Sequence, residues 1–359
     1  MTRRRPCSID VLVVGGGPAG CSAAASLARH GLAVTLLERS RYETTRVGET
    51  LPPKIGPRLQ AIGAGGAFAA DAHLPCPGAV SAWATAQPQE NDFIFSPYGT
   101  GWHLDRRRFD ESLAALAREA GVEVHQGADW PNARLAKDAS APRILLDASG
   151  RPAVVARSRS VPRTTLDRQV AVIGYGRAAA GADPRTMIEA ASSGWWYGAR
   201  LPEEKAVAAF FTDADLLPRN ASQRGAWWWK LLQAAPLVRE LLAVPQGVDS
   251  LRVVAASTSR LVRFAGDNWL ATGDAAMTFD PLSSQGILKA ITSGLRSAQA
   301  IIDLLAGNES AFAAYNAALE AEFDRYSGEC HSYYAQVRRW PDSLYWQRRQ
   351  EQINDHSPP

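Results

Sequence analysis

Cysteine and long apolar runs are both scarce in this sequence of 359 residues. The four cysteines share no metal-ligand spacing and are too few for a disulfide scaffold, so we expect a reducing compartment and no metal site. No stretch approaches the ~18 consecutive apolar residues of a membrane helix, so we expect no membrane partner. The composition is that of a soluble globular protein.

An excess of charge of one sign is lacking as well. The net charge is +3, from 39 basic and 36 acidic residues scattered along the chain. Nucleic-acid surfaces need clustered lysine and arginine, so no nucleic-acid partner is predicted. Arginines at positions 3–5 imitate a secretory signal, but the apolar run behind them covers only residues 9–14. We therefore expect a cytoplasmic protein.

A glycine-rich turn follows this apolar run. Residues 9–14 read as a buried strand, 18–30 as a small-residue helix and 32–38 as a second strand, which together form a right-handed βαβ unit. Such a unit is typical of the start of a doubly wound sheet. The turn between the first strand and the helix is therefore a candidate phosphate site.

Gly15, Gly17 and Gly20 give this turn the G-x-G-x-x-G spacing of a dinucleotide site. The first glycine permits the tight turn, the second permits close approach of a pyrophosphate, and the third permits helix-to-strand packing. Glu38 ends the second strand, where it would hydrogen-bond a ribose. The alternative is a glycine-rich turn in an unrelated α/β protein, which the flanking strand and helix disfavour. The motif alone does not separate FAD from NAD.

Two later segments favour FAD. Residues 272–276 read TGDAA, and residues 280–287 read DPLSSQGI. A carboxylate at a strand end, Asp274, suits a ribityl hydroxyl, and the helix that follows would direct its positive end at the flavin. With the glycine turn, these segments resemble the two FAD-binding fingerprints of the para-hydroxybenzoate hydroxylase and tryptophan halogenase superfamily. The alternative is that Asp274 only caps a turn.

The resemblance implies the fold as well as the cofactor. We expect an α/β protein with a Rossmann-like FAD-binding domain, a β-sheet substrate domain of the α+β kind found in para-hydroxybenzoate hydroxylase, and C-terminal helices. Strand-like segments interrupted by glycine, proline and tryptophan mark the second domain. The predicted bounds are 1–70, 101–165 and 250–308 for the discontinuous FAD-binding domain, 71–100 and 166–249 for the substrate domain, and 309–359 for the C-terminal helical segment.

The resemblance also implies contacts to FAD outside the two fingerprints. Arg46 and Glu49 lie where the family has a G-E-S/T sequence beside the isoalloxazine, and Arg106 begins a match to its R-x-x-F-D helix start. Taken singly, such residues are more often solvated than bound to a ligand. The expected cofactor-binding residues are Gly15, Gly17, Pro18, Ala19, Gly20, Glu38, Arg39, Arg46, Glu49, Arg106, Gly273, Asp274, Pro281, Ser284, Gly286 and Ile287.

The sequence lacks two features of tryptophan halogenases, which points to hydroxylation. These enzymes carry a W-x-W-x-I-P motif and a catalytic lysine, whereas residues 194–202 read GWWYGARLP and residues 74–83 contain no lysine. Without an amine to hold the oxidant, a C4a-hydroperoxyflavin formed from O2 is expected to deliver its oxygen directly to an electron-rich ring. No second G-x-G-x-x-G marks a nicotinamide domain, so NADH or NADPH would bind transiently or serve a separate reductase.

A more specific resemblance, to one group within this superfamily, covers nearly the whole chain. GWWYGARLP, residues 101–105 (GWHLD) and residues 338–346 (RRWPDSLYW) resemble the flavoproteins encoded beside quinone-cofactor amine and amino-acid oxidases, the LodB, GoxB and QhpG type. Members of this type oxygenate a tryptophan of a partner polypeptide on its way to tryptophylquinone. The resemblance therefore implies an FAD- and NAD(P)H-dependent monooxygenase whose substrate is a quinoprotein subunit precursor.

Four residues are candidates for the substrate end of the site. Trp195 and Trp196 are expected to wall an aromatic pocket, because flat ring faces stack on an indole; core packing is the alternative. His103 and Glu49 are candidates to accept the proton that the hydroxylated ring loses, although a structural role is the more usual one for a single histidine. Oxygen transfer needs a dry pocket more than a strong base, so we expect no catalytic triad.

Other functions stay open at this stage. A hydroxylase of a free aromatic metabolite would share every flavin motif, and so would a noncatalytic FAD protein that serves as an assembly factor. A prenyl-reductase-like enzyme is disfavoured because the middle of the chain is rich in tryptophan, where a polyprenyl tunnel would want aliphatic lining.

Overall fold

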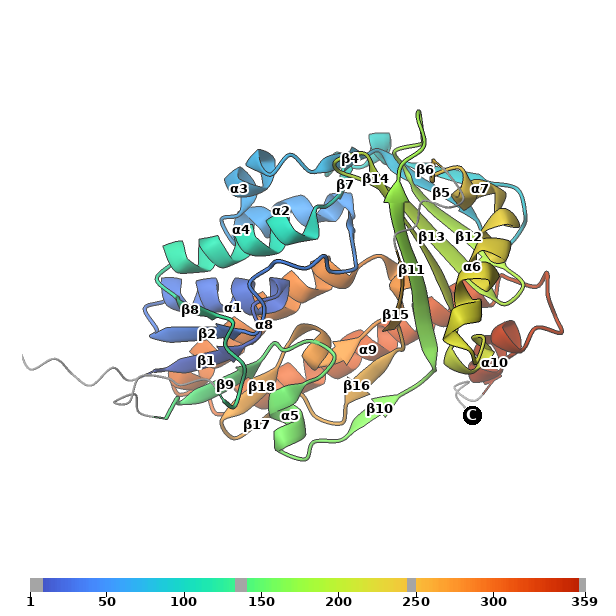
Figure 1. Cartoon of the computed structure of the whole chain (residues 1–359). Helices are drawn as coiled ribbons and strands as arrows, with labels where there is room; N and C mark the ends of the chain where they lie inside the picture. The colour runs from blue at the N-terminus through green and yellow to red at the C-terminus, as the bar shows by residue number, and fades with distance from the viewer. Residues whose placement is uncertain (1–8, 133–140, 244–249, 355–359) are drawn as a thin grey trace, which may run out of the picture.

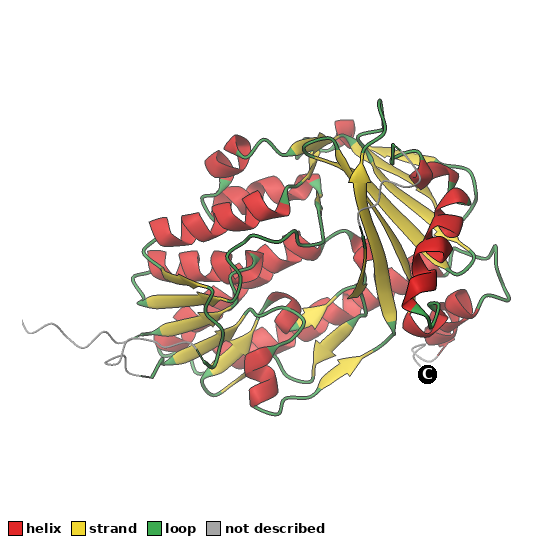
Figure 2. Ribbon diagram, in the orientation of Figure 1, coloured by secondary structure: helices red, strands yellow, loops and turns green. Residues whose placement is uncertain are grey.

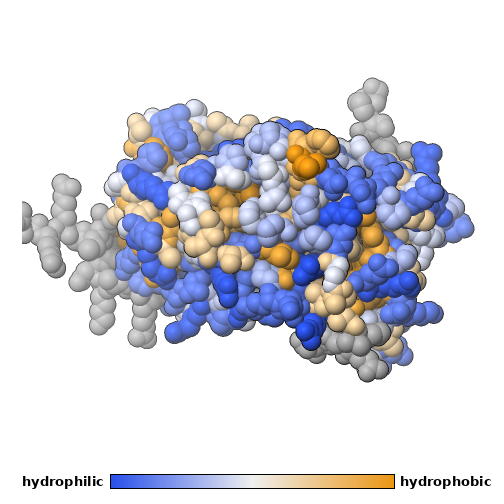
Figure 3. Space-filling view, turned by 90° about the horizontal axis from the view of Figure 1, so that it is seen from above, coloured by the Kyte–Doolittle hydropathy of each residue, from blue (hydrophilic) through white to orange (hydrophobic). Residues whose placement is uncertain are grey.

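The computed structural model describes residues 9–132, 141–243 and 250–354. The arginines at positions 3–5 and the last five residues of the predicted C-terminal segment lie outside these ranges. A layered half, with helices over a sheet, lies beside a half built around long strands (Figures 1 and 2). Seen from above, the surface is mostly hydrophilic with scattered apolar areas (Figure 3). No helix in the described ranges is both long and apolar enough to span a bilayer.

The layered half contains a six-stranded sheet in the order β17-β18-β9-β1-β2-β8. β1 (Val11–Val14) pairs in parallel with β2 (Val34–Glu38) and with β9 (Ile144–Asp147). All four residues of β1 are buried, as expected for a strand covered on both faces. The other strands are β8 (Glu123–Gln126), β18 (Trp269–Ala271) and β17 (Ala265–Gly266). The predicted α/β class and Rossmann-like sheet are confirmed.

Two helices that pack closely cover this sheet. α1 (Pro18–Arg29) begins at a proline, which suits the first helical turn, and buries a row of alanines. In α8 (Gly286–Leu305), a Cβ added at Gly294 would lie only 2.4 Å from the carbonyl oxygen of Ala19, so the two backbones approach as only glycine allows. This contact brings the first turns of both helices to the same cavity.

The second half contains a seven-stranded sheet in the order β15-β11-β14-β13-β12-β5-β6. Neighbouring strands are antiparallel except for β12 and β5, which are parallel. One face of the sheet packs on α6 (Arg224–Gln233), and the other packs on aromatic side chains of the C-terminal helices. The strands are β5 (Gly78–Ala82), β6 (Gln89–Asp92), β11 (Gln169–Arg177), β12 (Thr186–Ala191), β13 (Gly194–Leu201), β14 (Lys205–Asp213) and β15 (Leu251–Ala255).

One proposed domain bound differs from the strand pairing. The bound at residue 250 would assign β15 to the FAD-binding domain, but β15 pairs along its whole length with β11 of the seven-stranded sheet. Apolar periodicity alone does not say which sheet a short strand joins. We therefore place this bound after β15.

The remaining elements complete the two halves and the segments between them. The strands are β3 (Thr50–Leu51), β4 (Leu74–Cys76), β7 (Gly101–His103), β10 (Arg163–Thr165), β16 (Ser259–Leu261) and β19 (Met277–Thr278). The helices are α2 (Gly56–Ala61), α3 (Gly65–Ala70), α4 (Arg106–Glu119), α5 (Val154–Ser158) and α7 (Pro236–Arg239). The 3-10 turns are η1 (Pro53–Ile55), η2 (Phe93–Phe95), η3 (Ala214–Leu216), η4 (Ala221–Gln223), η5 (Gly273–Ala275) and η6 (Pro281–Ser283).

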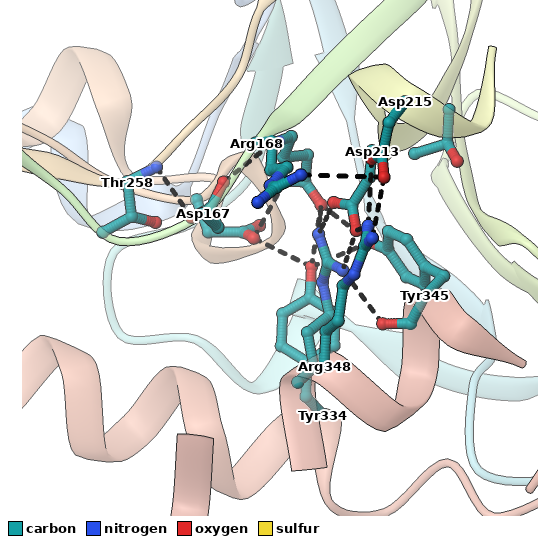
Figure 4. Close-up of polar contacts among 12 residues, drawn as sticks. Asp167, Arg168, Asp213, Asp215, Thr258, Tyr334, Tyr345 and Arg348 are labelled. Carbon is teal, nitrogen blue, oxygen red and sulfur yellow. Dashed lines mark hydrogen bonds and ion pairs between the residues drawn. The ribbon is translucent and has the colours of Figure 1, made fainter. Parts of the chain in front are cut away.

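Of the two C-terminal helices, α9 (Ala311–Tyr334) and α10 (Leu344–Asn354), α10 attaches to the seven-stranded sheet through ion pairs (Figure 4). Asp213, at the end of β14, accepts from Arg349 at 3.0 Å and from Arg348 at 2.7 Å. Arg348 also contacts the exposed carboxylate of Asp215 at 2.7 Å. Asp213 and Arg349 are almost fully buried, so the charge of Arg349 depends on Asp213 for compensation.

The same cluster reaches the turn that precedes α8. Arg349 donates to the side-chain oxygen of Gln169 at 2.9 Å, and the amide nitrogen of Gln169 donates to Asp280 at 2.9 Å. Tyr334 donates to the same Asp280 oxygen at 2.8 Å, and the other oxygen accepts from the Leu282 backbone at 2.8 Å. The position of η6 is therefore fixed by residues of β11, α9 and α10.

Candidate active site

A cavity of about 670 Å³ lies between the two large sheets, a size typical of ligand and cofactor sites. Its walls combine the glycine turn, the loop 44–50 and the start of α8 with side chains of β11, β13, β14 and β15. All the residues predicted to bind FAD line it except Gly20 and Gly273. Segments far apart in the sequence therefore line one cavity.

The three glycines of the turn have different surroundings. Gly15 has φ +111°, and a Cβ there would lie 2.2 Å from the carbonyl oxygen of Ala148. A Cβ at Gly20 would lie 1.9 Å from the carbonyl oxygen of Gly15, so both glycines are required for the fold of the turn. A Cβ added at Gly17, however, would lie 3.9 Å from its nearest neighbouring atom, which is on Arg46. Gly17 therefore leaves open space that a pyrophosphate would fill.

Glu38 and Arg46 form an ion pair beside this space. Glu38 accepts from the Gly16 backbone at 2.7 Å and from Ser40, and Arg46 donates to it at 2.8 Å. Arg46 also lies 3.3 Å from Asp110. Burial alone would raise the pKa of Glu38, but the hydrogen bonds from Ser40 and the charge of Arg46 outweigh it, so the pKa is lowered. Glu38 is thus a carboxylate that fixes the glycine turn and lines the cavity.

Arg106 shapes the loop that carries Glu49. It begins α4, as the R-x-x-F-D match predicts, and its guanidinium donates to the carbonyl oxygens of Val47 and Gly48 while contacting Asp110 at 3.1 Å. Arg106 is buried, and it lines the cavity. Its geometry supports a role in positioning the loop as well as the expected proximity to FAD.

Asp274 faces the cavity together with a lysine that sequence reasoning missed. The Lys289 ammonium lies 3.1 Å from Asp274, donates to the carbonyl oxygen of Met277 at 2.7 Å and sits 4.4 Å from the ring centre of Phe279. Burial would raise the pKa of Asp274, but the positive charges of Lys289 and then Arg151 lower it. Lys289 is buried on α8, so a lysine at an otherwise apolar helical position was the available signal.

The substrate end of the cavity contains only one of the two predicted tryptophans. Trp195 lines the cavity and stacks on Phe211, with ring centres 4.1 Å apart. Trp196, its neighbour in β13, points to the opposite face of the sheet and packs in the core against Phe210 and Trp228. Successive strand residues alternate between faces, so the two side chains cannot share one wall.

Glu49 is a buried acid that lines the same cavity as this aromatic wall. One of its oxygens accepts from the Tyr175 hydroxyl at 2.6 Å, and the other accepts from the Gly48 backbone at 3.0 Å. Its side chain lines the cavity and is almost fully buried. Burial raises the pKa of Glu49, and the opposing effects of Tyr175 and Arg106 do not cancel it. Glu49 therefore combines access to the cavity with an enhanced affinity for a proton.

His103 lies outside the cavity lining. Its Nε2 lies 3.0 Å from the Thr186 hydroxyl, which joins β7 to β12, and the ring is fully buried. Burial lowers the pKa of His103 to about 4, so the ring is neutral at physiological pH. Its surroundings fit the structural alternative, so of the two predicted proton acceptors only Glu49 lines the cavity.

Comparison with known proteins places this geometry in a family. The tryptophan halogenase family model matches residues 58–358, which is most of the chain. The chain belongs to the tryptophan halogenase family. A second model, for FAD dependent oxidoreductases, matches residues 10–48, the βαβ unit with its glycine turn. The protein is therefore a flavin-dependent oxidoreductase of this family, and the expected class of enzyme is confirmed.

Relatives within the family have different activities. The FAD-dependent oxidoreductase LodB of Marinomonas mediterranea is 28% identical over 95% of this chain and 97% of its own length. The flavin-dependent halogenase armH3 of Armillaria mellea is 27% identical over 99% of this chain and 80% of its own length.

Two solved structures show the same range of activities. The peptidyl tryptophan dihydroxylase QhpG superposes with a TM-score of 0.80, 26% identity and coverage of 96% of this chain and 79% of its own. The flavin-dependent halogenase CmlS superposes with a TM-score of 0.83 and 25% identity, and the match covers 94% of this chain and 67% of CmlS. The resemblance to the LodB and QhpG type is confirmed, in a family that also contains halogenases.

Proposed function

We propose that this protein is a monooxygenase that hydroxylates a tryptophan side chain of a partner polypeptide during tryptophylquinone biogenesis. One observation carries the choice of hydroxylation over halogenation. Among the described residues that line the cavity, Lys289 is the single lysine, and Asp274 and the Met277 carbonyl hold its ammonium. It is therefore not free to hold a hypohalous acid at the aromatic wall.

The described residues fit FAD as the cofactor. The open space at Gly17, the first turns of α1 and α8, and the carboxylates of Glu38 and Asp274 match a pyrophosphate between two ribose-like groups. Bound and reduced, FAD would supply two electrons to O2, so that one oxygen atom enters a ring C–H bond and the other leaves as water. The electrons would come from NADH or NADPH, directly or through a reductase.

The substrate end would orient an indole and accept its proton. Trp195 and Phe211 present stacked rings against which an indole can lie by offset or edge contacts. When a C–O bond has formed on the indole ring, the ring regains aromaticity by losing the proton from the same carbon. Glu49 would accept this proton as a carboxylate, with Tyr175 holding it in place.

The test uses FAD-loaded protein, NAD(P)H, oxygen and an unmodified quinoprotein-subunit precursor whose mass is followed. We expect a gain of about 16 or 32 mass units on one tryptophan, coupled to NAD(P)H use. Coupled turnover of free tryptophan or indole, with no gain on the precursor, would instead support a small-molecule hydroxylase. Binding of the precursor without any turnover would support an assembly factor, and incorporation of chloride or bromide faster than oxygen would overturn hydroxylation.

Replacing Glu49 by glutamine is expected to slow hydroxylation about 10- to 100-fold, because the ring proton loses its acceptor. The parent rate should rise with pH through the raised pKa of Glu49, since only the carboxylate accepts a proton, and this rise should vanish in the variant. Stopped-flow rates across pH measure both effects. Glu123→Gln, at an exposed carboxylate on β8, is the control. An unchanged pH profile in Glu49→Gln would assign the acceptor elsewhere.

A further inference from the structure

The strand β15 is an edge strand of the seven-stranded sheet. In the part of the chain that the structure describes, β15 pairs only with β11, and the hydrogen bond from the Ala256 backbone to the Gln169 carbonyl oxygen shows which residues face that neighbour. Because antiparallel pairs alternate, the backbone groups of Arg252 and Val254 face β11, and those of Val253 face away from it. Across residues 9–132, 141–243 and 250–354, the outward groups of Val253 have no hydrogen-bond partner.

The same strand forms part of the cavity wall. Arg252 and Val254 lie on one face of β15 and line the cavity. Their cross-strand partners in β11, Ile173 and Ala171, line the same wall. An added strand would run ~4.8 Å from β15, and every second side chain of it would point to the same face as Val254. This edge is thus continuous with the site where the proposed chemistry takes place.

The charge on this edge indicates what would bind there. Arg252 is exposed, and its guanidinium donates to the carbonyl oxygen of Thr45 at 3.0 Å. In the described part of the chain no carboxylate forms an ion pair with Arg252. Val253 leaves 41% of its surface exposed. An extended peptide with an acidic residue opposite Arg252 would satisfy the charge, and its side chain two positions away would lie opposite Val254.

We infer that the polypeptide substrate binds by adding a strand to β15. A tryptophan opposite Val254 enters the cavity, and an aspartate or glutamate two residues from that tryptophan pairs with Arg252. Main-chain hydrogen bonds to Val253 supply sequence-independent affinity, and alternate side chains supply the choice of tryptophan. This inference rests on the proposed function and names how its substrate is held.

The experiment compares Val253→Pro with the parent protein on the unmodified quinoprotein-subunit precursor. Proline at this position removes an outward N–H and leaves the pairing with β11 intact, so FAD binding and NAD(P)H oxidation without substrate should not change. We expect KM for the precursor to rise about tenfold. Glu90→Pro is the matched control, because Glu90 is the corresponding outward residue of β6, the opposite edge strand. Its KM should equal that of the parent.

A charge exchange tests the same contact without proline. Arg252→Glu is expected to raise KM for the precursor about tenfold, and replacing the acidic residue two positions from the modified tryptophan by lysine should restore it. Equal KM values for the parent, Val253→Pro and Arg252→Glu would overturn strand addition while leaving hydroxylation in place. Absence of any precursor turnover by the parent would instead reject the proposed function.

Discussion

The Asp213→Ala variant is expected to lose about 3–5 kcal/mol of its free energy of unfolding, because the buried guanidinium of Arg349 would be left without its carboxylate. Gln169 and the ring of Tyr345 would remain in contact with Arg349, but neither carries a compensating negative charge. Chemical denaturation followed by far-UV circular dichroism measures the change.

A neighbouring carboxylate provides the matched control for this effect. Asp215 also pairs with Arg348 at 2.7 Å, yet its side chain is 40% exposed. Exposed ion pairs contribute about 0–1 kcal/mol, so Asp215→Ala should be nearly as stable as the parent. If the two alanine variants unfold at the same denaturant concentration, burial of the Asp213–Arg349 pair is not what stabilises this part of the fold.

The Gly17→Ala variant is expected to fold like the parent and to bind FAD about 100-fold more weakly, a loss of about 2.7 kcal/mol of binding free energy. The new methyl group would meet no protein atom closer than 3.9 Å, so the fold has room for it. The methyl group would, however, occupy the space that the pyrophosphate needs. Titration of the apoprotein with FAD, followed by flavin fluorescence, measures the affinity.

Two other glycine variants serve as comparisons for Gly17→Ala. Gly66→Ala, in α3, has no atom within 4 Å of the added Cβ and should bind FAD normally. Gly20→Ala should instead fail to fold or lose stability, since its Cβ would lie 1.9 Å from the Gly15 carbonyl oxygen. Normal FAD affinity in Gly17→Ala would show that the cofactor does not approach the turn at this glycine.

The sequence was most informative where a few consecutive residues determine the geometry. The strand, turn and helix from β1 to α1 follow from local periodicity and from glycine spacing, and Arg106 begins its helix as the R-x-x-F-D match predicts. These features depend on backbone conformation within a short segment. Most of the predicted FAD-binding residues consequently line one cavity.

The sequence was less informative where contacts join distant segments. Alternation along β13 sends Trp195 and Trp196 to opposite faces of the sheet, but which of the two faces the cavity depends on how the sheet packs in the fold. Lys289 becomes a partner of Asp274 only when α8 packs beside η5. The pairing of β15 with β11 likewise joins residues about 80 positions apart, and the local periodicity of apolar residues does not predict such a contact.

The buried cluster of Gln169, Asp280, Tyr334 and Arg349 has a consequence for the order of events during protein synthesis. The glycine turn leaves the ribosome early, but the turn before α8 is held by groups from β11, α9 and α10. The flavin pocket therefore cannot take its final shape until residue 349 has been translated. The ribosome adds about 5–20 residues per second, starting at the N-terminus. A nascent chain would therefore carry its phosphate-binding turn for many seconds before it could hold the flavin ring in place.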